Sequence, residues 1–296
     1  MPRVALIVNP HASAVSPDGV AAVEAALRKA GEVQVLRTTG PGEATELARG
    51  AGADAVVVYG GDGAANEVLN GLDSDVPVGF LPGGGTSVLP RALGLPRDAE
   101  EAAERVADAL TRRRLRRISL GRVNGRRFAF SAGVGLDAEL VRRVDAKGRT
   151  LTGRRAGDLA FAWAAAQLLR ERRATFPPVL DVRGFGRAAF VFVANGRPYT
   201  YAGPVALDVA PQARFELGLD FVAPVRVDLR SVPRLLGYAV RGHGQDDASD
   251  VLYGHDLDGI DVICDTPLPL QADGEDLGDA TTVVFEAERG TVDVLV

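Results

Sequence analysis

Three glycines within four residues stand between a predicted strand and a predicted helix, in the segment Gly60-Gly61-Asp62-Gly63. Glycine lets a backbone approach an anion closely, and the N-terminus of the following helix adds a partial positive charge. An aspartate in such a loop repels a phosphate, so its expected role is to hold Mg²⁺ or to order the loop. The segment therefore predicts a phosphate-binding turn, with an ordinary strand-to-helix turn as the alternative.

A second glycine cluster runs from Pro82 to Thr86, again between a predicted strand and a predicted helix. The carboxyl ends of parallel strands meet at one edge of an open α/β sheet, so the two loops are expected to face one crevice. Neither loop has the GxGxxG pattern with an acid about 20 residues further on, which disfavours a Rossmann NAD site. Neither Lys29 nor Lys147, the only lysines, ends a GxxxxGK[ST] loop, which excludes a P-loop NTPase.

The elements that would carry these loops alternate along the first 120 residues. Apolar runs typical of buried parallel strands occupy residues 4–8, 33–36, 55–59 and 78–81. Helical patterns follow Ser16 and Asp98, which are residue types that cap helix N-termini, and also cover residues 44–50 and about 64–72. This alternation predicts an open, mostly parallel α/β sheet.

From Ile118 onward the pattern changes to strands joined by tight turns. Asn124-Gly125 is a two-residue hairpin signal, and the runs after Pro177-Pro178 have mostly β-type composition. One amphipathic helix over about 156–172 interrupts them. We therefore expect a second, mainly antiparallel domain.

Composition narrows the class of protein. The chain has 296 residues and a formal net charge of −5, which fits two domains and argues against a nucleic-acid partner. The single cysteine, Cys264, cannot form an internal disulfide, and the longest apolar run, residues 159–166, is too short for a transmembrane helix. The expected location is cytoplasmic.

The residues around the first loop also carry a family resemblance. GGDGAANEVLNG (60–71) resembles the signature of the diacylglycerol kinase catalytic-domain family, lipid kinases that include the sphingosine kinases and are distantly similar to NAD kinases and phosphofructokinases. The other matching segments are Asn9-Pro10, Thr38 ahead of GPGEATELAR, PGGGTSVLPRALGLP (82–96), FSAGVGLDAELV (130–141), VANGRPYTYAG (193–203) and LPLQADGE (268–275).

The resemblance implies both a fold and a reaction. The fold is an α/β nucleotide-binding domain over residues 1–119, similar to NAD kinase and phosphofructokinase, and a β-rich acceptor domain over 120–282, with 283–296 returning to the first. The reaction is transfer of the ATP γ-phosphate to the hydroxyl of a diacylglycerol-like lipid alcohol, with ATP and Mg²⁺ required and nucleotide between the domains. A catalytically weak lipid- or nucleotide-binding relative and an NAD kinase are the alternatives.

The family's functional positions map onto individual residues of this chain. The implied nucleotide contacts are Asn9, Thr38, Gly60, Gly61, Asp62, Gly63, Ala64, Ala65, Asn66, Glu67, Gly84, Gly85 and Thr86. Asp62 is the implied metal ligand and belongs to the catalytic set. Glu275 is the implied base, and Asp273 has a supporting role.

Three positions depart from the family pattern. Ala64 replaces the signature threonine, and Ser87 replaces an asparagine in the second loop, where the threonine also lies one position later. The family's structural Mg²⁺ site uses an Asp-Gly-Leu turn, whereas this chain has Leu217-Gly218-Leu219, so that site is doubtful here.

The expected partners are ATP, a lipid substrate and an anionic membrane surface at the inner membrane face, and a homodimer is an open alternative. The arginine run at residues 112–117 is either a solvated helix end or a docking site for anionic headgroups. The helix with Phe161, Trp163, Leu168 and Leu169 is either core or a contact for the lipid tail.

Overall fold

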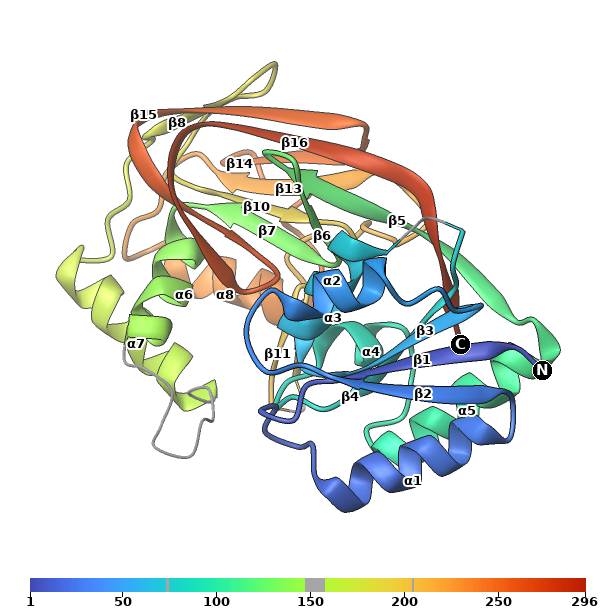
Figure 1. The fold of residues 1–296 in the computed structure, drawn as a ribbon. Helices are drawn as coiled ribbons and strands as arrows, with labels where there is room; N and C mark the ends of the chain where they lie inside the picture. The colour runs from blue at the N-terminus through green and yellow to red at the C-terminus, as the bar shows by residue number, and fades with distance from the viewer. Residues whose placement is uncertain (73–74, 147–157, 204) are drawn as a thin grey trace. The chain divides into compact units, whose positions relative to one another are not determined.

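The computed structural model describes residues 1–72, 75–146, 158–203 and 205–296, and the chain divides into two compact units (Figure 1). The first unit comprises Met1–Ile118 and Gly290–Val296, and the second comprises Ser119–Arg289. The segment that rejoins the first unit is thus shorter than the expected 283–296.

The first unit alternates strands and helices. Its elements are β1 (Arg3–Val8), α1 (Pro17–Arg28), β2 (Glu32–Arg37), α2 (Glu43–Arg49), β3 (Ala55–Gly60), α3 (Asp62–Gly71), β4 (Val78–Pro82), α4 (Val88–Ala92) and α5 (Ala99–Arg112). The strands run parallel in the order β4-β3-β1-β2, and the last residues of β16 (Glu275–Leu295) add a parallel strand beside β4. The predicted open parallel sheet is therefore confirmed.

Burial explains why these segments form strands and helices. The apolar runs of β1 and β3 are buried along their length, as a central parallel strand covered on both faces requires. Helices α1 and α5 cover one face of this sheet with side chains such as Leu27 and Val106, and α2 and α3 lie on the other (Figure 1). Ser16 and Asp98 accept main-chain N–H groups at the starts of α1 and α5, as their residue types predict.

The second unit is mainly antiparallel. Its elements are the end of β5 (Leu115–Val123), β6 (Arg126–Phe128), β7 (Ser131–Val134), α6 (Leu136–Ala146), α7 (Asp158–Glu171), β8 (Leu180–Val182), β9 (Gly186–Ala188), β10 (Val191–Ala194), β11 (Thr200–Ala202), β12 (Val205–Leu207), β13 (Leu219–Pro224), α8 (Val232–Arg241), β14 (Val251–Leu257), β15 (Gly259–Ala272) and most of β16. Its strand order is β14-β13-β10-β7-β15-β16, with every described pairing antiparallel.

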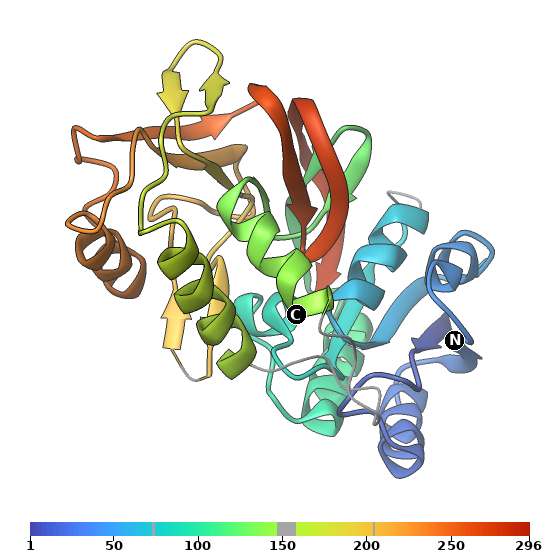
Figure 2. The same cartoon turned by 90° about the vertical axis from the view of Figure 1, so that its left-hand side faces the viewer.

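The predicted antiparallel domain is confirmed, but its helix content was underestimated. Helix α7 matches the predicted helix at 156–172, of which 156–157 lie outside the described residues. Helices α6 and α8 were not predicted, and Figure 2 shows α6 beside α7. Both missed helices are short, and α8 contains Gly237, a weak helix former.

Within the described parts of the chain, no helix is long and apolar enough to cross a membrane.

Candidate active site

The two glycine loops of the first unit lie against each other, backbone to backbone. Gly83 donates its N–H to the carbonyl of Gly60 over 2.8 Å. A Cβ atom on Gly83 would lie 2.8 Å from Gly60 Cα, and one on Gly84 would lie 2.9 Å from Gly61 Cα. No side chain fits at that distance, so the close approach itself requires glycine. The expected meeting of the two loops at one edge of the sheet is therefore present.

Asp62 ties the first loop to the helix that follows the second. Its Oδ2 accepts the N–H of Val88 at 3.0 Å, and its Oδ1 accepts the N–H of Leu89 at 3.1 Å. These donors open α4, whose own N-cap residue, Ser87, makes no side-chain cap bond. A carboxylate at a helix N-terminus contributes about 0.5–2 kcal/mol as a cap. Of the two roles expected for Asp62, the structure contains the ordering of the loop.

Glu67, at the other end of the segment GGDGAANE, also caps the start of a helix. Its Oε1 accepts the N–H of Gly42 at 2.9 Å, and its Oε2 accepts the N–H of Ala44 at 3.1 Å. Gly42 is the N-cap of α2 and has no side chain to satisfy these groups. The two acids of GGDGAANE thus each cap a helix that lies elsewhere in the chain.

The other predicted nucleotide contacts gather at the same edge of the first unit's sheet. Asn9 follows β1, and its Oδ1 accepts the N–H of His11. Thr38 follows β2, is buried, and donates its N–H to the carbonyl of Val8. The first loop holds the buried residues Ala64, Ala65 and Asn66, and the second holds Gly85 and Thr86 at its surface. The carboxyl ends of β1 to β4 therefore bring every one of these residues to one edge.

The substituted position Ser87 has a local role in the second loop. Its Oγ accepts the N–H of Gly84 at 3.1 Å and lies 3.0 Å from the Gly84 carbonyl. Its backbone is left-handed, with a φ of 47°. The hydroxyl thus holds the loop folded back on itself.

In the second unit, Asp273 supports the turn that carries the predicted base. Its carboxylate is buried and accepts three consecutive main-chain N–H groups, those of Ala129 (2.6 Å), Phe130 (3.0 Å) and Ser131 (3.2 Å). A carboxylate with three such donors fixes the backbone on both sides of the contact. This arrangement agrees with a supporting role rather than with proton transfer.

Glu275 is the first residue of β16, and its side chain is 32% exposed. Its Oε2 forms an ion pair with the guanidinium of Arg126 on β6. Arg126 was missed by the sequence analysis, and its one signal was its position directly after the Asn124-Gly125 turn. The ion pair orients the predicted base, while the exposed third of the side chain remains open to solvent.

A buried polar cluster contacts the turn at 273–274. It joins three of the segments that carry the family resemblance. Gln271 Nε2 donates to Asp137 Oδ2 at 2.7 Å and to Tyr199 Oη at 3.0 Å, and the Tyr199 hydroxyl also donates to Asp137. Gln271 Oε1 accepts the N–H of Gly274, so the cluster is hydrogen-bonded to the turn at 273–274. The three residues come from segments 130–141, 193–203 and 268–275, and none was singled out from the sequence.

Burial controls the ionisation of this cluster. Desolvation raises the pKa of the Asp137 carboxyl, while hydrogen bonds from Tyr199 and Gln271 act in the opposite direction. Desolvation and the nearby Asp137 charge raise the pKa of the Tyr199 hydroxyl well above its usual value. The tyrosine therefore stays a hydrogen-bond donor at neutral pH.

The described residues could hold Mg²⁺ only together with the phosphate oxygens of a bound substrate. Among the described residues, no group of three or more His, Cys, Asp and Glu side chains could hold a metal ion. Kinase Mg²⁺ is commonly held by one or two carboxylates together with the phosphate oxygens of the substrate. Each oxygen of a carboxylate has two lone pairs, so Asp62 can accept its N–H bonds and still ligate an ion.

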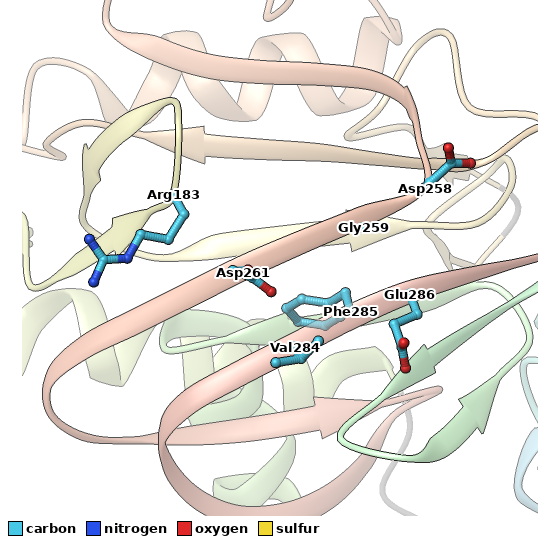
Figure 3. Close-up of a pocket in the computed structure, with 7 residues that line it drawn as sticks. All are labelled: Arg183, Asp258, Gly259, Asp261, Val284, Phe285 and Glu286. Atoms are coloured by element: carbon cyan, nitrogen blue, oxygen red, sulfur yellow. The ribbon is translucent and has the colours of Figure 1, made fainter.

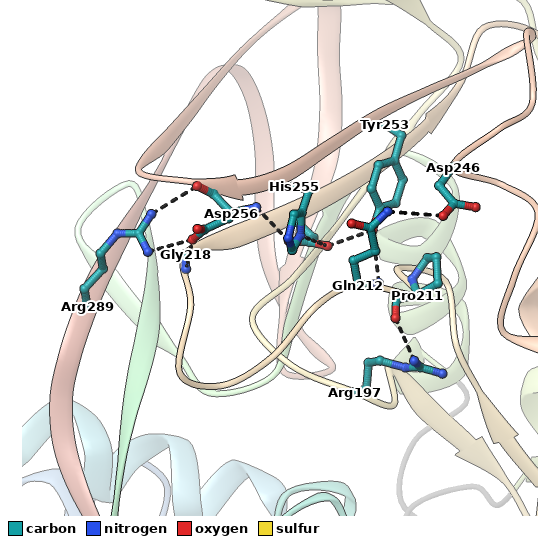
Figure 4. A network of polar contacts seen from close by, with 10 residues as sticks. Arg197, Pro211, Gln212, Gly218, Asp246, Tyr253, His255, Asp256 and Arg289 are labelled. Carbon is teal, nitrogen blue, oxygen red and sulfur yellow. Dashed lines mark hydrogen bonds and ion pairs between the residues drawn. The ribbon is translucent and has the colours of Figure 1, made fainter.

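The residues at the family's second, structural metal position do not fit a metal (Figure 4). Leu217 stands where the family has a carboxylate, and a Cβ on Gly218 would lie 2.6 Å from Arg289 Nη2. Arg289 pairs with Asp256 at 2.6 Å and with Asp258 at 2.5 Å, and Gly218 N–H donates to Asp256 Oδ1 at 2.7 Å. A guanidinium thus supplies the positive charge at this turn.

Three other features lie apart from these residues. The hollow in Figure 3, of about 460 Å³, lies on the β15–β16 hairpin between Arg183, Asp261 and Glu286, and none of the predicted site residues lines it. In the arginine run, Arg112 and Arg114 pair with Asp108. These pairs favour the interpretation of the run as a solvated helix end. In α7, Leu168 is buried and Trp163 is 58% exposed, so that helix has both a core face and a solvent face.

Comparisons with known proteins agree with this arrangement. Residues 3–123 match the family model described as the diacylglycerol kinase catalytic domain. A curated diacylglycerol kinase of Bacillus subtilis (strain 168) is 34% identical over 184 residues, which are 59% of this chain and 58% of the relative. The chain thus spans less than two thirds of that relative's length.

Solved structures share the fold of the whole chain. A crystal structure of a diacylglycerol kinase from Bacillus anthracis strain Sterne has a TM-score of 0.72 at 20% identity, over 99% of this chain and 96% of that one. A second structure from the same organism has a TM-score of 0.76 at 23% identity, over 99% and 94% of the two chains.

The chain shares with these structures a fold made of an α/β unit and an antiparallel unit. Over residues 3–123, the chain is similar to the diacylglycerol kinase catalytic-domain family.

The buried cluster predicts a pH-dependent stability. The raised pKa of Asp137 means that its contribution to stability is full below its ordinary pKa of 3.8 and is lost as pH rises through the raised value. Asp137→Asn cannot ionise, so the difference in melting temperature, variant minus wild type, should increase between about pH 4 and pH 8. Thermal unfolding across this range measures the difference. Asp18→Asn, at an exposed site, is the control, and an equally flat difference for both variants would refute the assignment.

The Arg289 contacts predict that the protein does not need a metal ion at the Leu217 turn for its thermal stability. Adding EDTA should leave the melting temperature of the wild type unchanged, because a guanidinium already balances Asp256 and Asp258. Arg289→Met should lower it by about 2–4 °C, and added Mg²⁺ should not restore it. Arg214→Met, at an exposed arginine, is the matched control. A drop of several degrees in the wild type with EDTA alone would contradict this account.

Proposed function

We propose that the protein is an ATP- and Mg²⁺-dependent lipid kinase that phosphorylates the hydroxyl of a diacylglycerol-like lipid alcohol. The observation that carries the proposal is the close packing of two glycine pairs, Gly60–Gly83 and Gly61–Gly84, which leaves no room for a side chain. It lies inside the segment that matches the kinase family model. Main-chain N–H groups and the start of α3 are the groups that bind phosphates without base or sugar specificity.

In this proposal the first unit binds the nucleotide phosphates. The two loops position the triphosphate, and Asn9 and Thr38 extend the site along the ends of β1 and β2. Asp62 keeps α4 docked and would be the protein ligand of Mg²⁺, which offsets the negative charge of the phosphates when bound. Phosphoryl transfer depends mostly on such positioning and charge stabilisation.

The second unit supplies the proton acceptor. The lipid hydroxyl oxygen forms a bond to the γ-phosphorus, the bond from that phosphorus to the β–γ bridging oxygen breaks, and ADP leaves. The hydroxyl proton passes to the Glu275 carboxylate, which Arg126 holds in one orientation. Asp273 fixes the turn that carries Glu275 and takes no proton in this scheme.

A catalytically weak relative is the second candidate, and one substitution favours it. Ala64, in the first loop, is buried and lacks the hydroxyl of the family's threonine. Such a protein would bind nucleotide or lipid with little turnover. The NAD kinase alternative has less support, because the segments 193–203 and 268–275 resemble lipid kinases.

The assignment of Glu275 predicts a specific loss of turnover. Glu275→Gln keeps the size of the side chain but removes the proton acceptor, so kcat should fall by about 10²–10⁴-fold. The KM for ATP should remain within about threefold, because the substituted group does not bind phosphate. Transfer of labelled phosphate to dioctanoylglycerol in detergent micelles measures both constants.

Glu286→Gln is the matched control, because it makes the same chemical change at an exposed glutamate of β16. It should retain wild-type turnover. Full activity of Glu275→Gln would remove the role proposed for Glu275. Absence of lipid phosphorylation by the wild type across a panel of lipid alcohols would favour the weak relative, and preferential phosphorylation of NAD would favour the NAD kinase.

A further inference from the structure

Helix α8 (Val232–Arg241) presents an apolar stripe to solvent on the second unit. Leu236 and Val240 are 59% and 57% exposed, and Leu229, just before the helix, is 72% exposed. Within α8, the exposed residues Pro233, Leu236 and Val240 are three and four residues apart and fall on one side of the helix, and Leu229 lies in the turn before it. We call these four residues the α8 stripe. Clustered exposed side chains of this size mark a contact surface more often than single ones do.

The α8 stripe is exposed although the other side of the helix is well packed. The other side of α8 packs on the unit, where Val232 and Leu235 contact the cluster around Phe190. The carbonyl of Ala239 also accepts the N–H of Asp208 at 2.7 Å. Helix α8 is therefore anchored through one side while the α8 stripe faces outward.

Arginines flank the stripe. The segment 226–241 carries four arginines and one aspartate in a chain whose net charge is −5. Arg226, Arg230 and Arg241 are exposed, and none of them forms an ion pair with any residue that the structure describes. Arg234 pairs with Asp250 and lies over the Tyr238 ring. This contrasts with the run at 112–117, where Arg112 and Arg114 share Asp108.

An apolar helix face flanked by arginines fits the interface of an anionic bilayer. The apolar side chains enter the acyl boundary, while the arginine stems lie along it and their charged heads reach the lipid phosphates. A second copy of this chain fits less well. A symmetric dimer would bring α8 against α8, and the unpaired arginines of both copies would repel each other.

We infer that the α8 stripe and its flanking arginines dock the protein on membranes that contain anionic phospholipids. The inference deepens the proposed function, because a kinase with a lipid acceptor must reach its substrate in a bilayer. Docking through α8 holds the second unit, which carries Glu275, at the membrane surface. The contact is peripheral and reversible, and it weakens as salt screens the arginines.

Cosedimentation of the full chain with vesicles tests the inference. The wild type should bind vesicles of phosphatidylcholine with about 30% phosphatidylglycerol at least tenfold more strongly than pure phosphatidylcholine, with weaker binding at high salt. Leu236→Ser with Val240→Ser should reduce binding about tenfold at every salt concentration, because it removes insertion. Arg230→Glu with Arg241→Glu should abolish the preference for the anionic vesicles.

Two control variants distinguish binding through the α8 stripe and its arginines from nonspecific binding to vesicles. Leu115→Ser changes an apolar residue of similar exposure (46%) beside the other arginine run, and Arg214→Glu reverses an exposed charge elsewhere on the second unit. Both should bind as the wild type does. Circular dichroism melts check that each variant is folded, which is expected because every changed side chain is exposed.

The possible results each decide the question. Unchanged binding by the Leu236/Val240 variant, or no vesicle binding by the wild type, would overturn the inference. So would a wild-type dimer in sedimentation velocity that this variant dissociates, because the stripe would then be a protein interface. Phosphorylation of dioctanoylglycerol in micelles, measured on the same samples, separates the two proposals. Activity without vesicle binding removes only the docking surface, and vesicle binding without activity removes only the kinase assignment.

Discussion

Carboxylates that accept main-chain N–H groups from distant segments hold the candidate site in shape. Asp62 binds the start of α4, Glu67 binds the start of α2, and Asp273 binds three successive amides at 129–131. The amides that Asp62 and Glu67 bind lie at helix starts, where no intrahelical partner exists for them, and those that Asp273 binds lie just before β7 and at its first residue. Loss of such an acceptor leaves N–H groups without a partner, which costs about 1–3 kcal/mol for each buried group.

This constraint explains why acidic residues lie inside a loop suited to bind phosphate. The repulsion between a carboxylate and a phosphate is reduced when the carboxylate is already surrounded by N–H donors. The glycines Gly60, Gly61, Gly83 and Gly84 can then line the site with backbone alone, and the acids beside them set its shape. The same division recurs in the second unit, where Asp273 is buried and fixes the turn, while Glu275, the proposed base, is one third exposed.

Local sequence patterns predicted the strands, helices and turns, but not the side-chain contacts between segments that are distant in the sequence. The buried runs at 4–8 and 55–59, the caps Ser16 and Asp98 and the hairpin at 123–126 all depend on neighbouring residues, and all were correctly predicted. The amides that Asp62 binds lie 26 and 27 residues away and the arginine that pairs with Glu275 lies 149 away, and no local pattern encodes such contacts. Helix α8 was missed for a related reason, because Leu236 and Val240 face solvent and a core pattern does not describe them.

The proposed function requires that the main chain of the two glycine loops binds the phosphates of a nucleotide. NMR titration of the isotope-labelled protein with a non-hydrolysable ATP analogue and Mg²⁺ tests it most directly. The amide resonances of residues 60–65 and 83–86 should shift together and saturate at one concentration of analogue. Saturable binding that leaves these amides unchanged while others move would contradict it.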